Sequence, residues 1–258
     1  MSLAVITLSS EGALLADLLI RRLPDVRLFL HEKLEKDRRA ESFESITELT
    51  KAIFKKYKGL VYIAPCGVIV RAIAPLLEHK TKDPAVVVVD VQGRWAVSLL
   101  SGHEGGANDL AITVANALSA EPVITTTTEA VKTLIVGVGC RRGTKSEKIK
   151  AAIRAALTEV DLEISQVRLL SSAEIKSDEQ GLLQAAQELG VPLLFISSGE
   201  IRGFAGNFDR SDFVQEKVNL PAVAEPSALI AGRRTRLILK KRTFNGVTVA
   251  IARENYLS

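Results

Sequence analysis

Short runs of hydrophobic residues alternate along the chain with longer segments in which hydrophobic residues recur every three or four positions. The short runs are typical of buried strands and the longer segments of amphipathic helices. Pro75 is expected to kink or end its helix because proline removes a backbone donor. Gln92 and Gly93 predict a hairpin. In the first half we expect strands at 3–8, 26–30, 60–64, 85–91 and 95–100, a strand or an extended exit at 122–128, and helices at 11–23, 41–57, 67–80 and 107–119.

The same alternation starts again near Thr133. Thr144 and Glu147 have the spacing of a capping box, which predicts the beginning of a helix there. Gly190 is a typical helix end, and Asn245-Gly246 is a preferred hairpin turn. Strands are expected at 133–139, 167–171, 192–197, 236–242 and 247–253, helices at 144–157, 178–190 and 225–232, and polar loops over 198–220.

The recurring order of strand, small-residue loop and helix predicts an α/β protein. We expect two three-layer α/β/α domains, residues 1–130 and 131–258, with mostly parallel sheets and a hairpin-type antiparallel addition to each. No Gly/Pro-rich linker lies near 129–133, so the two domains are expected to be closely joined. A chain of 258 residues is long enough to bury a core in each of them.

The composition points away from a membrane protein and from a disulfide-stabilised one. No hydrophobic run reaches the roughly 18–20 residues that a membrane-spanning helix needs. The N-terminal segment lacks the basic and long apolar regions of a signal peptide. Two cysteines, Cys66 and Cys140, are too few for a disulfide framework. We therefore expect a soluble cytoplasmic protein with free thiols.

The positive charge is concentrated in the second half of the chain. Residues 1–132 hold 16 Lys+Arg and 16 Asp+Glu, whereas residues 133–258 hold 18 and 14, so the second half carries the net charge of +4. This bias favours an anionic partner. A small polyanion fits at least as well as nucleic acid, since aromatic residues make up only 5% and no zinc-finger or RNA-recognition motif is present. We expect neither a nucleic-acid nor a membrane partner.

Four loops follow strands and precede helices: 9–12, 65–67, 101–108 and 137–144. Ligands bind beyond the carboxyl ends of strands in open α/β sheets, and the N–H groups at helix N-termini attract anions. The alternative, favoured for 65–67, is that the glycines only close turns. A histidine, a carboxylate and three glycines within 101–108 favour function there. The residues of this loop expected to bind substrate are Ser101, Gly102, Gly105, Gly106 and Asn108.

His103 is the best candidate in the chain for a general acid or base. A free imidazole titrates near pH 6.5, so small shifts of its pKa make it useful near neutrality. Glu104, beside it, could orient His103 or take a proton itself. The plainer alternatives are a capping or core histidine and a solvated loop carboxylate. His31 and His79 have polar, charged neighbours and are expected at the surface.

Two segments with arginines are candidates for binding anions. Arg71 lies one helical turn after Cys66 and Gly67, where it could bind a ligand carboxylate in bidentate fashion or form only a surface ion pair. GCRRGT places Arg141 and Arg142 in a glycine-bounded loop before a helix, which favours a clamp for a polyanion. It lacks the Gly-Lys-Ser/Thr of a Walker loop and the last glycine of a dinucleotide fingerprint. Further ligand contacts are expected from Gly139 and Thr144.

Both cysteines follow a strand beside a glycine. A nucleophilic thiol needs a base partner, and His103 could be that partner if the loops meet. The alternative is that Cys66 and Cys140 are only small residues that fill tight loops. No cluster of His, Cys, Asp or Glu has the spacing of metal ligands, so we expect no metal or other cofactor bound by the protein itself.

Three stretches together resemble the CbiG family of cobalamin biosynthesis, the cobalt-precorrin-5A hydrolases. They are APCGVIVRAIAPLLEHKTKDPAVVVVD (64–90), SLLSGHEGGANDLA (98–111) and VGVGCRRGT (136–144). AEPSALIAG (224–232), followed by LILKKR, is similar to the family's closing segment. The resemblance spans about residues 3–253. Family members carry an additional middle region, whereas here PVITTTT runs almost directly into TLIVGVGC, so the chain resembles a compact form without it.

The resemblance implies a substrate and a reaction. The substrate would be a tetrapyrrole with acetate and propionate arms that brings its own cobalt. The reaction would open a δ-lactone on the macrocycle, release acetaldehyde and give cobalt-precorrin-5B. Such chemistry needs an activated water, a stabiliser for the oxyanion and a proton donor.

Our hypothesis distributes these tasks over the loops. His103 or Glu104 would activate the water. Backbone N–H groups of Gly105, Gly106 and Ala107 would hold the oxyanion, and Arg71, Arg141 and Arg142 would hold the carboxylate arms.

Two other functions stay open. The chain could be a non-catalytic tetrapyrrole-binding or carrier protein of the same pathway. It could also be a nucleotide or phosphate binder of the flavodoxin-like type, which SSEG (9–12) suggests. A homodimer and transient contact with other enzymes of the corrin pathway are compatible with the first two functions.

Overall fold

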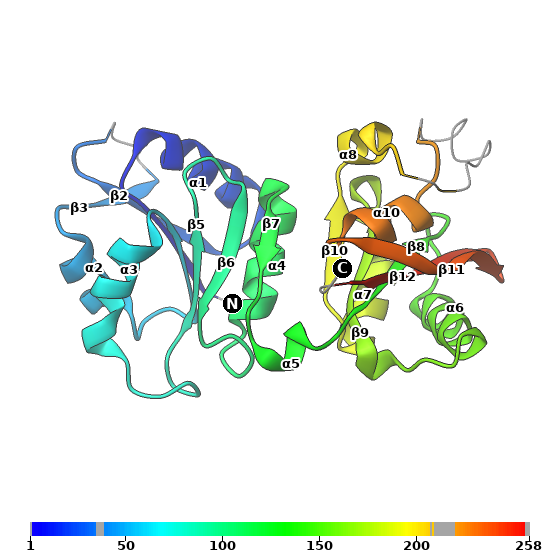
Figure 1. Ribbon diagram of the computed structural model, residues 1–258. Coiled ribbons are helices and arrows are strands. Elements are labelled where there is room, and N and C mark those ends of the chain that lie inside the picture. The colour runs from blue at the N-terminus through cyan, green and yellow to red at the C-terminus, as the bar shows by residue number, and fades with distance from the viewer. Residues whose placement is uncertain (1, 35–38, 207, 209–219, 256–258) are drawn as a thin grey trace. The chain divides into compact units, whose positions relative to one another are not determined.

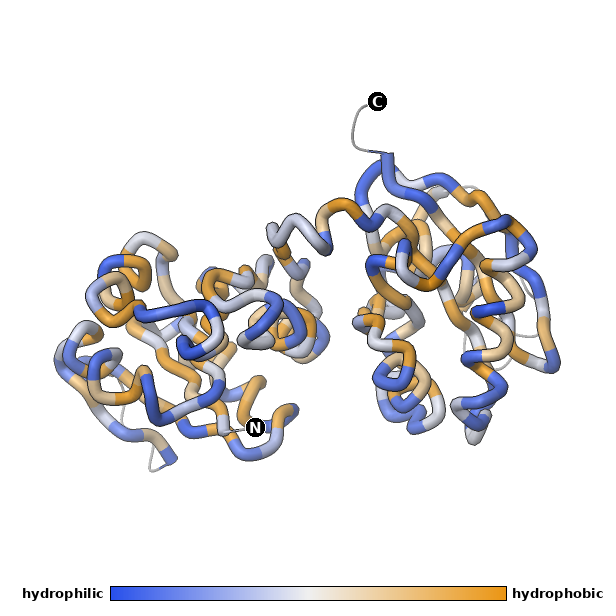
Figure 2. Tube along the Cα trace, turned by 90° about the horizontal axis from the view of Figure 1, so that it is seen from below, coloured by the Kyte–Doolittle hydropathy of each residue, from blue (hydrophilic) through white to orange (hydrophobic). Residues whose placement is uncertain are grey.

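The computed structural model describes residues 2–34, 39–206, 208 and 220–255. Contacts within the chain divide it into unit 1, Met1–Thr126, and unit 2, Thr127–Ser258. Each unit contains one β-sheet with helices packed against it (Figure 1). In Figure 2 the hydrophobic stretches run through the middle of each unit, and hydrophilic ones line its periphery. The predicted α/β class with mostly parallel sheets is confirmed.

Unit 1 has a seven-stranded sheet in the order β3-β2-β1-β4-β5-β6-β7. Neighbouring strands are parallel except β5 and β6, which form the predicted antiparallel hairpin around Gly93. The strands are β1 (Leu3–Thr7), β2 (Val26–His31), β3 (Ala40–Phe43), β4 (Gly59–Ile63), β5 (Ala85–Val89), β6 (Trp95–Leu100) and β7 (Glu121–Val123). The helices are α1 (Ser10–Arg22), α2 (Ile46–Ile53), α3 (Cys66–Ile73), the 3-10 turn η1 (Ala74–Leu76) and α4 (Ala107–Leu118).

Helices cover both faces of this sheet. Ile6 and Tyr62 pack in one core cluster with residues of α2 and α3. Their neighbours Thr7 and Ile63 approach Gly12 of α1. Because successive strand residues point to opposite faces, α2 and α3 lie on one face and α1 on the other. α4 packs against α1 and completes the second layer.

Unit 2 has a five-stranded sheet in the order β10-β9-β8-β12-β11. β8, β9 and β10 are parallel, whereas β12 joins β8 antiparallel. β11 and β12 form the predicted hairpin, in which Asn245 and Gly246 both have a positive φ. The strands are β8 (Leu134–Gly139), β9 (Val167–Ala173), β10 (Leu193–Ile196), β11 (Thr235–Phe244) and β12 (Val247–Glu254). The helical segments are α5 (Thr127–Ala130), α6 (Ser146–Glu159), η2 (Ile164–Gln166), η3 (Glu174–Lys176), α7 (Gln180–Leu189), α8 (Ser198–Gly203) and α10 (Ala224–Ile230).

A glycine sets the distance between this sheet and one of its helices. Ile149 of α6 and Leu182 of α7 pack with Val136 in one core cluster. The next residue, Gly137, faces the other way, and a Cβ added there would lie 1.9 Å from the carbonyl oxygen of Ala224. α6 and α7 therefore cover one face and α10 the other, where only a glycine permits so close an approach.

Two predicted helices of unit 1 are shorter than expected. Residues 40–43 pair with β2 as a strand, and α2 begins only after Ser45, whose hydroxyl accepts the N–H of Glu48. The predicted helix at 67–80 ends at Ile73 and continues as the 3-10 turn that contains Pro75. A capping side chain and a proline, both local features, override the hydrophobic period here.

The capping box predicted at Thr144 is wrong. The Thr144 hydroxyl donates to the carbonyl oxygen of Arg141 at 2.7 Å, and α6 begins at Ser146 without a side-chain cap. β7 is also shorter than the predicted strand at 122–128, because Thr127 already begins α5.

The predicted loop at 198–220 is interrupted by a helix. Residues 198–203 form α8, which a capping box between Ser197 and Glu200 begins. Within this segment, residues 207 and 209–219 lie outside the described residues.

Candidate functional site

The reversed strand β6 decides where the His103 loop lies. Because β6 is antiparallel to β5, Leu100 at its end lies opposite Val86, near the beginning of β5. The loop at 101–106 therefore lies near the N-terminal ends of the parallel strands, which form one edge of the sheet. Cys66 follows the end of β4 and lies at the other edge.

The structure does not bring Cys66 and His103 together. The two edges are separated by the length of a five-residue strand, roughly 15 Å. A thiol and an imidazole need to be within hydrogen-bond reach to act as nucleophile and base. Within unit 1, Cys66 and His103 therefore cannot act together as nucleophile and base.

The loop at 101–106 uses its own carbonyl groups to hold the beginning of α4. The N–H groups of Ala107 and Asn108 donate to the carbonyl oxygens of Ser101 and Gly102, at 3.1 and 3.0 Å. These amides would otherwise be unpaired donors of the first helical turn. Ala107, which we expected to help hold an oxyanion, is therefore already engaged.

Gly105 and Gly106 carry backbone donors that do not take part in these bonds. No hydrogen bond to their N–H groups is formed by the residues that the structure describes. A Cβ added at Gly105 would lie 2.3 Å from the Cβ of Ser101, and Gly106 has a φ of +83°. Ser101 itself has a φ of +59°, and its buried hydroxyl has no hydrogen-bond partner among the described residues. Strained backbone of this kind is often found at functional sites.

Asn108 ties the loop to the segment that leaves unit 1. Its side chain is buried, accepts the hydroxyl of Ser98 at 2.9 Å and donates to the hydroxyl of Thr126 at 2.9 Å. A Cβ added at Gly102 would come within 2.6 Å of the Thr126 side chain. Asn108 and Gly102 therefore hold the loop in place through contacts inside the protein.

His103 and Glu104 lie exposed on the outside of the loop. The ammonium group of Lys80 forms an ion pair and a hydrogen bond with the Glu104 carboxylate. This hydrogen bond lowers the pKa of Glu104 below the ordinary value of a glutamate. Glu104 is consequently ionised near neutral pH and is a weak base there. Lys80 is 24 residues away in the sequence, and no motif pointed to it.

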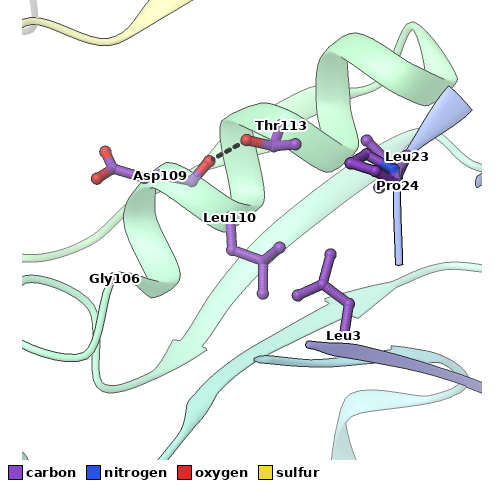
Figure 3. A pocket seen from close by; sticks show the side chains of 7 residues that line it. All are labelled: Leu3, Leu23, Pro24, Gly106, Asp109, Leu110 and Thr113. Carbon is purple, nitrogen blue, oxygen red and sulfur yellow. Dashed lines mark hydrogen bonds between the residues drawn. The ribbon is translucent and has the colours of Figure 1, made fainter. Parts of the chain in front are cut away.

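A pocket of about 380 Å³ opens beside the first turn of α4 (Figure 3). The side chains of Leu3 and Leu110 point toward each other across it. The carbonyl oxygen of Asp109 accepts the hydroxyl of Thr113 at 2.8 Å. The volume of the pocket is in the range of small-molecule sites, which are mostly apolar with a few polar groups. The lining residues are Leu3, Leu23, Pro24, Gly106, Asp109, Leu110 and Thr113. Sequence reasoning missed this pocket because its walls come from separate elements.

Arg71, Cys66 and Gly67 come together at the beginning of α3. The exposed Arg71 guanidinium donates to the carbonyl oxygen of Gly67 at 2.9 Å, and the Cys66 thiol is exposed. The N-cap residue, Pro65, gives no side-chain cap. A carboxylate at this helix end would meet both the positive end of the helix dipole and a guanidinium.

In unit 2, acidic residues of a neighbouring loop bind groups of the GCRRGT loop. Arg142 pairs with Asp178 at 2.8 Å, and this hydrogen bond lowers the pKa of the Asp178 carboxyl. The N–H of Gly143 donates to the buried carboxylate of Glu179 at 3.0 Å. Burial raises the pKa of the Cys140 thiol, which makes it a poor nucleophile. The predicted clamp therefore contains acids as well as arginines.

The other predicted residues of this loop lie close by. Gly139 is the last residue of β8, and the exposed Arg141 follows two residues later. The hydroxyl of Thr144 is used inside the loop, as described above. Asp178 and Glu179 were missed because they are far from the arginines in sequence and carry no distinctive motif.

The described residues contain neither a cluster of metal ligands nor a membrane-spanning helix. No three His, Cys, Asp or Glu side chains there gather in a way that could hold a metal ion. None of the helices in that part of the chain is both long and apolar enough to cross a membrane.

Two family descriptions match the chain. "Cobalamin synthesis G N-terminal" matches residues 48–129, and "Cobalamin synthesis G C-terminus" matches residues 134–252. The matches cover the His103 loop and the GCRRGT loop, respectively. Only residues 130–133 separate them.

Curated relatives are similar over nearly the whole chain. A cobalt-precorrin-5A hydrolase of Priestia megaterium is 26% identical, with 96% of this chain and 94% of that protein covered. A protein of the same name from Salmonella typhimurium is 25% identical, with 97% of each chain covered. Protein CobE of a Sinorhizobium species is 32% identical over 128 residues, which are 49% of this chain and 83% of that protein.

The chain is shorter than these hydrolases. The alignment with the Priestia megaterium protein is 352 positions long, whereas the chain has 258 residues. The difference, 352 minus 258, leaves at least 94 positions of that relative without a counterpart here. This agrees with the compact form, without a middle region, that the sequence predicted.

Proposed function

The chain belongs to the CbiG family, and from that premise we propose that it is a cobalt-precorrin-5A hydrolase. It would open the δ-lactone of its substrate and release acetaldehyde to give cobalt-precorrin-5B. The observation that carries the proposal is the exposed His103 in the loop whose Gly106 lines the pocket at the beginning of α4, within the matched N-terminal segment. The relatives that carry this name support it at modest identity.

The proposed reaction begins with water. The neutral imidazole of His103 takes a proton from a water molecule, which attacks the carbonyl carbon of the lactone. The acyl C–O bond breaks, and the substrate gains a carboxylate arm and a hydroxyl group that receives the proton. When this hydroxyl loses its proton, the bond between its carbon and the macrocycle breaks. Acetaldehyde leaves, and the electron pair stays on the macrocycle, which is then protonated.

Glu104 is the weaker candidate for the base. Its ion pair with Lys80 stabilises the carboxylate form, so it binds a proton less readily near neutral pH. We therefore assign proton transfer to His103 and give Glu104 the task of holding the loop. The free N–H groups of Gly105 and Gly106 would stabilise the oxyanion.

The carboxylate arms of the substrate would bind to arginines outside the reacting loop. Arg71 at the beginning of α3 is exposed and close to the end of the helix dipole. Arg141 is exposed as well, and Arg142 would have to exchange Asp178 for a substrate carboxylate. Cobalt would enter with the macrocycle rather than on protein ligands.

One observation favours a second function, that of a non-catalytic tetrapyrrole-binding protein. At least 94 positions of the Priestia megaterium hydrolase have no counterpart in this chain. A segment of that size could carry part of the catalytic machinery. Such a protein would bind the same macrocycle and leave the lactone closed.

Incubation of the purified protein with cobalt-precorrin-5A distinguishes the two functions. We expect acetaldehyde in a one-to-one ratio to the substrate consumed and a product whose mass shows the gain of water and the loss of acetaldehyde. Acetaldehyde is measured with an alcohol dehydrogenase coupled assay and the product by mass spectrometry. Binding of the substrate without acetaldehyde would show the carrier and reject the hydrolase.

A further inference from the structure

Two arginines lie directly opposite each other in the sheet of unit 2. Arg236 on β11 pairs with Arg253 on β12 in the antiparallel register. Directly opposite residues have Cβ atoms about 4.5–5.5 Å apart and project from the same face. Like charges in this position destabilise a sheet. A sequence that keeps two guanidinium groups here therefore accepts a cost in stability.

Among the described residues, no acid pairs with either of these arginines. Neither side chain forms an ion pair or a hydrogen bond with any residue of the described part of the chain. Arg253 is partly buried, and Arg236 is exposed. Arg168 of the same sheet is different, since its guanidinium binds both oxygens of Glu254, at 2.7 and 3.0 Å. Where an arginine has a structural role in this sheet, a carboxylate accompanies it.

Protection of the sheet edge explains Arg236 but not Arg253. β11 is an edge strand, and a charge such as Arg236 deters pairing with another chain. β12 lies between β8 and β11 and has no free edge, so Arg253 cannot have this role. The two positive charges face one patch of surface without a counter-ion of their own.

We propose that Arg236 and Arg253 form a binding site for the carboxylate groups of a small polycarboxylate ligand. Two arginines at directly opposite strand positions can present two guanidinium groups to one ligand, and each guanidinium can bind a carboxylate in bidentate fashion. The choice of a tetrapyrrole as the natural ligand rests on the proposed function, whereas the anion site itself does not.

This site is separate from the GCRRGT loop. Arg253 lies opposite Leu134, the first residue of β8, whereas the loop follows Gly139, the last residue of that strand. The two basic sites therefore lie at opposite ends of one sheet. A ligand carboxylate can therefore bind at the Arg236–Arg253 end without competition from Asp178, which pairs with Arg142 at the other end.

The site is tested with uroporphyrin, a stable tetrapyrrole whose rim carries acetate and propionate arms. Its fluorescence is titrated with the full chain, with Arg236→Gln, with Arg253→Gln and with the double variant. We expect each single substitution to weaken binding about tenfold and the double substitution more than that, because charge-assisted hydrogen bonds are lost. Added salt should weaken the wild type more than the double variant.

Arg154→Gln is the matched control. Arg154 is exposed on α6 in the same unit, and its replacement removes the same charge. It should bind uroporphyrin within twofold of the wild type. Thermal unfolding checks the fold, and the double variant should be at least as stable as the wild type because the repulsion across the strands is gone.

Several results would overturn the site. These are wild-type binding by the double variant, an equal loss in Arg154→Gln, no binding by the wild type, or tighter binding of a single-stranded oligonucleotide than of uroporphyrin at these arginines. The acetaldehyde assay is independent of this titration. Uroporphyrin binding that needs both arginines, without acetaldehyde release, would retain the site and reject the hydrolase.

Discussion

Two glycine-rich loops, residues 101–106 and 140–145, both follow a strand and lead into a helix, but their charged groups are used differently. In the first loop, His103 lies exposed on the outside, and Gly106 of the same loop lines a pocket. In the second, the guanidinium of Arg142 is paired with Asp178. One loop presents a group that can move a proton, and the other presents a cation that already has a partner.

The comparison shows that a glycine-rich loop before a helix does not by itself offer free N–H groups to a ligand. Carbonyl oxygens of the first loop engage the N–H groups of Ala107 and Asn108, and Glu179 engages that of Gly143 in the second. What distinguishes the loops is therefore the side chains on their outer surfaces. We expect the first loop to perform the reaction and the second to adjust binding strength.

The largest effect is expected from His103→Gln. Loss of a general base typically lowers the rate by about 10²–10⁴-fold, so acetaldehyde release should fall into that range. His31→Gln, in the same unit and at the end of β2, is the matched control and should retain the wild-type rate. A rate for His103→Gln within threefold of the wild type would remove this loop from the chemistry.

A substitution in each loop compares how tightly the two are packed. A Cβ at Gly105 would lie 2.3 Å from the Cβ of Ser101 and 2.8 Å from its carbonyl oxygen, so Gly105→Ala should lower the free energy of unfolding by about 2 kcal/mol. Gly143 has open space around it and a φ of +73°, so Gly143→Ala should cost only the strain of that backbone, about 1 kcal/mol. Denaturant titration measures both. Equal losses would show that the loops are packed alike.

The pH dependence of the rate shows which side chain of the first loop is the base. The Lys80 hydrogen bond lowers the pKa of Glu104, so Lys80→Met should raise that pKa toward the ordinary carboxylate value. If Glu104 were the base, the acid limb of the rate profile would move to higher pH in this variant. We expect no such movement, because we assign the base to His103. Acetaldehyde release between about pH 4 and 9 gives the profile.

The smallest effect is expected at the second loop. Asp178→Asn removes the acid that binds Arg142, so the guanidinium becomes available to a ligand. Because exposed ion pairs are weak, affinity for uroporphyrin, measured in the Arg236→Gln/Arg253→Gln background so that only this loop is observed, should rise only about two- to threefold. The gain should vanish when Arg142→Gln is added. An unchanged affinity in Asp178→Asn would mean that Arg142 does not reach the ligand.

Much of the fold could be predicted because local patterns carry it. The hydrophobic run at 85–89 is buried on both faces, and Asn245-Gly246 supplies the positive φ values that a tight hairpin needs. Local chemistry also explains the errors. Ser45 accepts a backbone N–H and delays α2, and the hydroxyl of Thr144 turns back into its own loop.

The candidate site could be predicted only in part. The sequence indicated the exposed His103, because a histidine among glycines is a local feature. It did not indicate Lys80, which controls the protonation of Glu104, or Thr126, which holds Asn108. These partners are distant in the chain and are ordinary residues in sequence.

The sequence by itself determined the order of strands and helices, the two glycine-rich loops and the resemblance to the CbiG family. It also contained the hairpin at Gly93, which reverses β6. Only the tertiary structure decided that Cys66 and His103 lie at opposite edges of one sheet and that Arg236 lies opposite Arg253. The physical reason is that periodicity and turns depend on neighbouring residues, whereas strand order and register depend on packing between segments far apart in the chain.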